Sequence, residues 1–181
     1  VRSLNFSYDG LVAGTPGQAT YYNFTQANES RTPVIYTGAN DGMLHAFNAD
    51  TGVELFSYVP SVVYSKLSAL TSSNYTHRYI VDGNTYAGDA YIGATPSWKT
   101  ILLGTTGGGG KGIFALDITD PTNFTASNVM WEFTDADLGF VHGQAKIALL
   151  NDGTWVAIIS NGYNSTSDKA YLYVVNLQTG A

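Results

Sequence analysis

The chain has 181 residues, of which 44% are hydrophobic, and a formal net charge of −6 at pH 7; this hydrophobic share is normal for a folded globular chain. Only 12% of the residues are charged, and the eight Lys and Arg residues are spread along the sequence. A nucleic-acid partner is therefore not expected, because a phosphate backbone requires a concentrated basic surface. The chain contains no Cys, which excludes disulfides and thiolate metal sites. No apolar run approaches the ~20 residues of a membrane-spanning helix.

The first thirty residues carry no clear periodicity. They combine Gly, Thr, Asn and Gln with isolated aromatic residues, so we expect residues 1–30 to form a loop-rich N-terminal segment or an insertion, with room for one strand. The chain begins with Val1 rather than Met, and no signal peptide is visible. We therefore expect it to be a segment cut from a longer precursor.

From residue 31 onward the pattern predicts an all-β structure. Turn residues separate three stretches rich in β-branched and aromatic side chains: Val34–Thr37, Met43–Asn48 and Glu54–Val59. The first turn, Asn40-Asp41-Gly42, is a strong hairpin signal, because the central residues of such turns need positive φ. Together these stretches predict an antiparallel meander. One short inserted helix should follow over Ser61–Leu70, where apolar residues recur at helical spacing.

The same strand pattern recurs twice along residues 31–181. A second unit combines Asp89–Ile92, Trp98–Leu103, Gly112–Ile118 and Val129–Phe133, and a third combines Gln144–Leu150, Trp155–Ile159 and Ala170–Asn176. Such repeats are typical of β-propeller blades. At roughly 60–70 residues the period is longer than that of a simple blade, so insertions are expected. The third unit ends at Ala181 without an outermost strand, and we expect the remaining blades of a larger propeller to lie outside this sequence.

The glycine stretch Gly104–Gly112 suggests a nucleotide site at first sight, because Gly107, Gly109 and Gly112 match G-x-G-x-x-G. That motif requires a helix after the loop, since the helix N-terminus holds the phosphate. Here the loop joins two predicted strands. We therefore interpret it as a flexible connection between strands and expect no nucleotide cofactor.

Candidates for catalysis and metal binding are weak. The three histidines, His45, His77 and His142, are far apart in sequence and fit no catalytic motif. The best local metal candidate is the pair Asp135 and Asp137, because two carboxylates one residue apart in a loop can converge on calcium. The pair lacks the further acidic and amide positions of a calcium loop. We predict no catalytic residue and no cofactor in this segment.

The segments named above resemble the PilC/PilY-type type IV pilus tip-associated adhesins. The resemblance covers about residues 31–181 and depends on the order of several motifs. They are Thr37–Phe47 (TGANDGMLHAF), Tyr58–Ser61, His77–Gly83, Gly110–Asp117, Trp131–Phe133, Asn161–Ser165 and Leu172–Val175. It implies part of the C-terminal β-propeller of a large secreted bacterial protein, located at the pilus tip or the outer-membrane surface.

The resemblance also implies a function. This family supports pilus assembly, opposes retraction and contributes to adhesion, with minor pilins of the tip complex and a host or abiotic surface as partners. The family's calcium loop lies in a later blade and has no match here, so calcium is expected only elsewhere in the full-length protein. Two alternatives remain open: a quinoprotein-type dehydrogenase fragment, whose repeats resemble the Asp50-Thr51-Gly52 turn and its strand, and an outer-membrane assembly scaffold.

Overall fold

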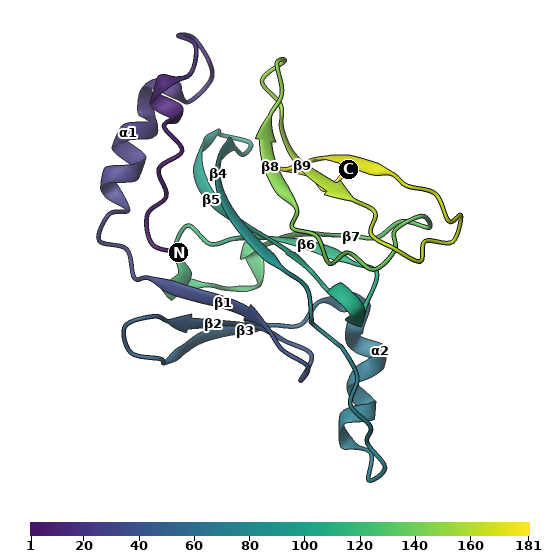
Figure 1. Cartoon of the computed structure of the whole chain (residues 1–181). Coiled ribbons are helices and arrows are strands. Elements are labelled where there is room, and N and C mark those ends of the chain that lie inside the picture. Colours follow the sequence, from purple (N-terminus) through teal and green to yellow (C-terminus); the bar gives the residue numbers. More distant parts are fainter.

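The computed structural model describes all residues, 1–181, and contains three antiparallel sheets that do not close into a ring (Figure 1). The first sheet has the order β1 (Val34–Gly38), β2 (Leu44–Asn48) and β3 (Glu54–Tyr58). The second contains β4 (Thr85–Ile92), β5 (Ser97–Thr105), β6 (Ile113–Asp117) and β7 (Val129–Phe133). The third contains β8 (Lys146–Leu149), β9 (Trp155–Ser160) and β10 (Leu172–Asn176). The predicted all-β fold with three blades of a partial propeller is confirmed.

One local structure at the end of β2, β6 and β10 shows that the sheets are repeats. The last residue of each strand accepts a hydrogen bond on its side-chain oxygen from the backbone N–H two residues further on. The pairs are Asn48 with Asp50 at 2.9 Å, Asp117 with Thr119 at 3.0 Å, and Asn176 with Gln178 at 3.0 Å. These three strands therefore occupy the same position in their respective blades. It follows that β4 and β8 are the first strands of their blades, and that β3 and β7 are the last.

Hydrophobic clusters fill the spaces between the blades. The first and second sheets share a cluster of buried side chains: Leu44, Leu102, Phe114, Leu116 and Ile118. A larger cluster of 18 buried residues joins the second and third sheets and includes all three Trp residues. One of these, Trp131 of β7, donates its indole N–H to the carbonyl of Leu177 after β10, at 2.8 Å. The blades thus bury their faces against one another, as propeller blades must.

The expected inserted helix lies between the first two blades. It consists of a 3₁₀ turn at Ser61–Val63, the α-helix α2 (Tyr64–Leu67) and a second 3₁₀ turn at Ser68–Thr71. Further 3₁₀ turns occur in connections, at Tyr8–Gly10, Gly107–Gly109, Pro121–Asn123 and Ala126–Asn128. None of the helices is long and apolar enough to cross a membrane.

Residues 1–30 contain a further helix, which the sequence did not predict, and the strand that we allowed in this segment is absent. The helix is α1 (Gln18–Ala27), whose central residues Thr20–Thr25 are Thr, Tyr, Asn and Phe, all of modest helix propensity. Contacts with the second blade stabilise it. Tyr21 is 1% exposed and donates its hydroxyl to Asp89 at 2.8 Å. Just before the helix, the carbonyl of Gly17 accepts the indole N–H of Trp98 at 2.9 Å.

Candidate interaction surface

One end of the propeller collects its long connections. Because strands alternate in direction, the β1–β2, β5–β6 and β9–β10 loops lie at the same end as the two segments that cross between blades. These loops are residues 39–43, 106–112 and 161–171, and the crossing segments are residues 59–84 and 134–145. We call this region the crossover end. Helix α2 projects from it in Figure 1.

The first crossing segment is held by backbone hydrogen bonds to both neighbouring blades. Ile80 and Val81 are buried, and the N–H of Val81 donates to Ala39 of the β1–β2 loop at 3.3 Å. The next residue, Asp82, donates its N–H to Thr106 of the β5–β6 loop at 3.3 Å. The amide side chain of Asn40 accepts the N–H of Ile80 at 3.0 Å. Residues 80–82 therefore form a fixed base for the exposed side chains around them.

The glycine loop differs from the flexible connection that we predicted. Gly107 and Gly109 are buried in a 3₁₀ turn beneath the first crossing segment. A Cβ on Gly109 would lie 1.8 Å from the carbonyl oxygen of Ile80, and a Cβ on Gly107 would lie 2.7 Å from that of Asp82. The glycines therefore permit close backbone packing. The loop does join strand to strand, as the sequence indicated.

A single amide side chain anchors the second crossing segment and the β9–β10 loop. Asn161 is 3% exposed. Its side-chain N–H groups donate to the carbonyls of Asp137 at 3.0 Å and Lys169 at 2.8 Å, and its oxygen accepts the N–H of Tyr171 at 3.1 Å. The loop is further fixed where Phe140 and Tyr163 exchange two backbone hydrogen bonds. This loop therefore has a defined shape despite its length.

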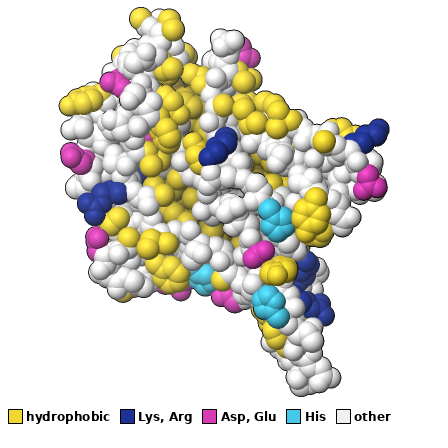
Figure 2. Space-filling model, viewed as in Figure 1, with side chains coloured by type: hydrophobic (Ala, Val, Ile, Leu, Met, Phe, Trp, Pro, Cys, Tyr) yellow, Lys and Arg dark blue, Asp and Glu magenta, His cyan; other side chains and the backbone are white.

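Aromatic and histidine side chains gather on this surface. Tyr79 and Tyr163 are 56% and 59% exposed. The ring of His142 stacks on Tyr163, with the ring centres 5.4 Å apart, and His77 lies edge-on to Tyr79 at 5.4 Å. Figure 2 shows histidines beside hydrophobic side chains where the molecule narrows toward α2. Such rings provide amphipathic contact area of the kind found in protein interfaces.

His45 on the first blade lies between two carboxylates. Its Nδ1 is 2.7 Å from Glu54 Oε1, and its Nε2 is 2.9 Å from Asp41 Oδ2. The hydrogen bond to Glu54, followed by the one to Asp41, raises the pKa of His45 above its usual value. This arrangement links the β1–β2 loop to β3.

Asp135 and Asp137, the metal candidates from the sequence, lie in the turn after β7. The Asp135 carboxylate accepts the N–H of Asp137 at 2.8 Å and the hydroxyl of Tyr173 at 2.8 Å. These two bonds lower the pKa of Asp135. No group of three or more His, Cys, Asp or Glu side chains is arranged to hold a metal ion here or elsewhere in the chain. The local contacts of Asp135 thus serve the turn, and a metal at the pair stays a prediction.

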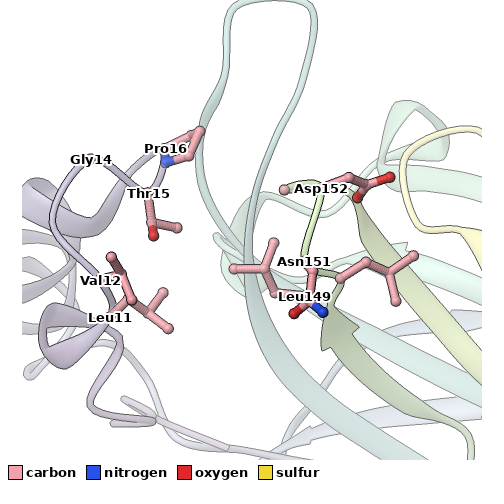
Figure 3. Close-up of a pocket in the computed structure, with 10 residues that line it drawn as sticks. Leu11, Val12, Gly14, Thr15, Pro16, Leu149, Asn151 and Asp152 are labelled. Atoms are coloured by element: carbon pink, nitrogen blue, oxygen red, sulfur yellow. The ribbon is translucent and has the colours of Figure 1, made fainter.

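The opposite end of the propeller holds the largest hollow, of about 580 Å³. Figure 3 shows the loop that contains Leu11 and Val12 on one side of the gap, and Leu149 and Asn151 of the β8–β9 hairpin on the other. Its lining is largely aliphatic and backbone, with Asp152 as the only charged residue. No set of polar side chains converges there as a catalytic site would require.

Several important residues were not singled out from the sequence. Asn161 lies in a segment that carried the resemblance, but its role depends on carbonyls up to 24 positions away. Asp89 was placed in a strand, and its burial beside Tyr21 could not be foreseen. One signal was available: an Asn stands at or next to the start of the loops after β1 and β9, at Asn40 and Asn161, and both bind a crossing segment.

Three repeated antiparallel sheets, one of four strands and two of three, pack against one another and define the chain as part of a β-propeller. The family model described as the PilY1 beta-propeller domain matches residues 7–181. The chain therefore belongs to the PilY1 β-propeller domain family.

Individual relatives agree with this assignment. Two proteins of Xylella fastidiosa named type IV pilus biogenesis factor PilY1 homolog are each 46% identical over 93% and 99% of this chain. The type IV pilus biogenesis factor PilY1 of Pseudomonas aeruginosa is 42% identical over 89% of it. The chain spans only 12–14% of the length of these relatives.

A solved structure agrees as well. The crystal structure of the Pseudomonas aeruginosa PilY1 C-terminal domain matches with a TM-score of 0.77 and 36% identity. The match covers 99% of this chain and 34% of that one.

Proposed function

We propose that this chain is a non-catalytic binding module of a type IV pilus biogenesis factor. The observation that carries the proposal is the match of nearly the whole chain to the PilY1 propeller family, whose relatives bear that name. In this role the protein supports pilus assembly, opposes pilus retraction and contributes to adhesion to a host or abiotic surface. Its place is outside the cell, at the pilus tip or the outer-membrane surface.

The physical basis is a rigid set of blades that presents a decorated loop surface. The crossover end has anchored loops and exposed aromatic rings, which suits contact with protein partners. We propose minor pilins of the pilus tip complex as those partners. The edge of β10, and the edge of β1 beyond Val34, which is bonded to Val1, suit pairing with further strands of the same protein, because unpaired strands offer free N–H and C=O groups.

The proposal can be tested in a bacterium that lacks its own copy of the full-length protein. Reintroduction of the intact protein should restore surface pili, measured in sheared fractions, together with adhesion. A Gly109→Val variant should restore neither, because its side chain would collide with the first crossing segment. The matched control is Gly10→Val, since nothing lies within 4 Å of a Cβ at Gly10.

A second bacterial strain, in which pilus retraction is also blocked, separates a role in assembly from a role in retraction. If the protein opposes retraction, blocking retraction should return pili to cells that lack it. If pili stay absent, the protein acts in assembly alone. A purified full-length protein with quinone absorbance and dye-linked oxidation would instead favour the dehydrogenase alternative. Recovery of outer-membrane assembly factors in place of minor pilins would favour the scaffold.

A further inference from the structure

The β9–β10 loop encloses a small hollow of about 260 Å³ at the crossover end. Five residues of the loop with polar or aromatic side chains line it, together with Gly162 and Ala170: Tyr163, Asn164, Ser165, Asp168 and Lys169. The volume lies just below the ~300–1,000 Å³ of pockets that hold drug-sized ligands. The hollow therefore suits a ligand of one or two small rings.

The loop around this hollow is held in place before any ligand arrives. Its carbonyls at Lys169 and Asn164 accept hydrogen bonds from the side chain of Asn161 at 2.8 Å and from Lys111 Nζ at 2.7 Å. The hydroxyl of Ser165 donates to the carbonyl of Lys169 at 3.3 Å. A preorganised loop loses little conformational entropy on binding, which favours a binding site.

The side chains of Asn164, Asp168 and Lys169 at the hollow, by contrast, are left without partners. The bonds that fix the loop use the backbone carbonyls of Asn164 and Lys169, so the amide and the ammonium group remain free. The carboxylate of Asp168 takes part in none of the four ion pairs of the chain. A free amide, carboxylate and ammonium group thus surround a small hollow beside an exposed tyrosine ring.

The backbone of the loop is also unusual. Three non-glycine residues of the chain have positive φ, and two of them, Asn164 (φ 59°) and Asp168 (φ 54°), lie in this loop. Both belong to the residues that line the hollow. Residues held in this region of φ and ψ are concentrated at ligand-binding sites, where the surrounding structure offsets their cost.

The chemistry of these groups favours one class of ligand. Asp168 and Lys169 have opposite charges, so the rim offers no net charge for an ion. The free amide, carboxylate and ammonium groups can bond several hydroxyls, while the Tyr163 ring can contact an apolar ring face. The backbone of Tyr163 is already paired with Phe140, which leaves no strand edge there for a peptide. These properties match a neutral sugar.

We propose that the β9–β10 loop is a binding site for a neutral saccharide residue, with Tyr163 beneath the sugar ring and Asp168 and Asn164 bonded to its hydroxyls. This inference rests on the proposed adhesive function and names the chemical class of one of its ligands. His142 stacks on Tyr163 and helps to hold the ring in position.

The test uses the purified full-length protein and a printed array of neutral and acidic oligosaccharides, followed by calorimetry with the best ligand. Neutral saccharides should bind. Tyr163→Ala should weaken binding about tenfold or more through loss of ring contact, and Asp168→Ala by about the same factor through loss of a charged hydrogen bond. Tyr163→Phe should stay within about threefold, because the ring face remains.

Tyr22→Ala is the matched control, since Tyr22 is 60% exposed on α1, away from the crossover end, and its affinity should not change. The proposal is overturned if no neutral saccharide binds, if acidic ones bind preferentially, or if Tyr163→Ala binds like the unmodified protein. Surface pili are counted in the same variants. Normal pili with no saccharide binding would refute this inference and leave the proposed function intact.

Discussion

Replacing Tyr21 with Phe removes one oxygen from the contact between α1 and the second blade. That hydroxyl donates to Asp89 at 2.8 Å and accepts the N–H of Phe6 at 3.2 Å. The Asp89 carboxylate is 1% exposed and would keep one side-chain donor, the Thr100 hydroxyl at 2.7 Å. A hydrogen bond to a charged group contributes ~1.5–3 kcal/mol. We expect Tyr21→Phe to destabilise the docked helix by about this amount.

The effect should depend on pH, and its sign follows from Asp89. Burial raises the pKa of Asp89, while the bonds from Thr100 and Tyr21 lower it. Loss of the Tyr21 bond therefore raises this pKa further. A group whose pKa is raised by folding binds its proton more readily in the folded state. The free-energy cost of burying its charge therefore disappears as pH falls and the group is protonated. The cost of Tyr21→Phe should be largest at neutral pH and smaller in acid, where Asp89 is protonated.

Hydrogen exchange of the α1 amides in the full-length protein measures this local stability. A loss of ~1.5–3 kcal/mol corresponds to about 10- to 150-fold faster exchange at pH 7. Tyr22→Phe is the matched control, because Tyr22 is next to Tyr21 in the helix but is 60% exposed. If Tyr21→Phe changed exchange less than about threefold, with the same ratio at every pH, the Tyr21–Asp89 bond would contribute no stability and this reasoning would be wrong.

Two further predictions concern the first blade and the crossover end. Gly109→Ala should destabilise the second blade by ~1–3 kcal/mol through overpacking against Ile80, whereas the control Gly10→Ala should not. Urea unfolding followed by Trp fluorescence would compare the two variants. Equal unfolding midpoints would contradict the packing argument. Because the pKa of His45 is raised in the folded state, its stabilisation should be full below pH ~6.5 and fall as pH rises through the folded pKa. His45→Gln should remove this dependence, which unfolding at pH 5.5 and 8 would show, and an unchanged pH profile would refute the role of its carboxylate partners.

Local sequence patterns were sufficient to predict the strands and their turns. The hairpin at Asp41-Gly42 follows from turn chemistry, but only Gly42 has a positive φ, of 101°, and Asp41 does not. The loop between β1 and β2 covers residues 39–43, so it is longer than the two-residue turn in which both central residues need positive φ. Alternating β-branched and aromatic residues marked strands such as Val129–Phe133, whose bounds the structure reproduces. These features depend on residues next to one another in the chain, which is why composition and spacing could reveal them.

Only the tertiary structure decided how distant residues meet. Helix α1 forms where Tyr21 reaches Asp89, 68 positions away. The Thr, Tyr, Asn and Phe residues at its centre have modest helix propensity and do not specify a helix by themselves. The glycines of the β5–β6 loop are packed rather than mobile because the crossing segment lies against them. Likewise, the hollow beside Tyr163 exists because Asn161 holds two separate segments at once. The sequence specifies blades through neighbours along the chain, whereas the surface between blades depends on partners that become neighbours only after folding.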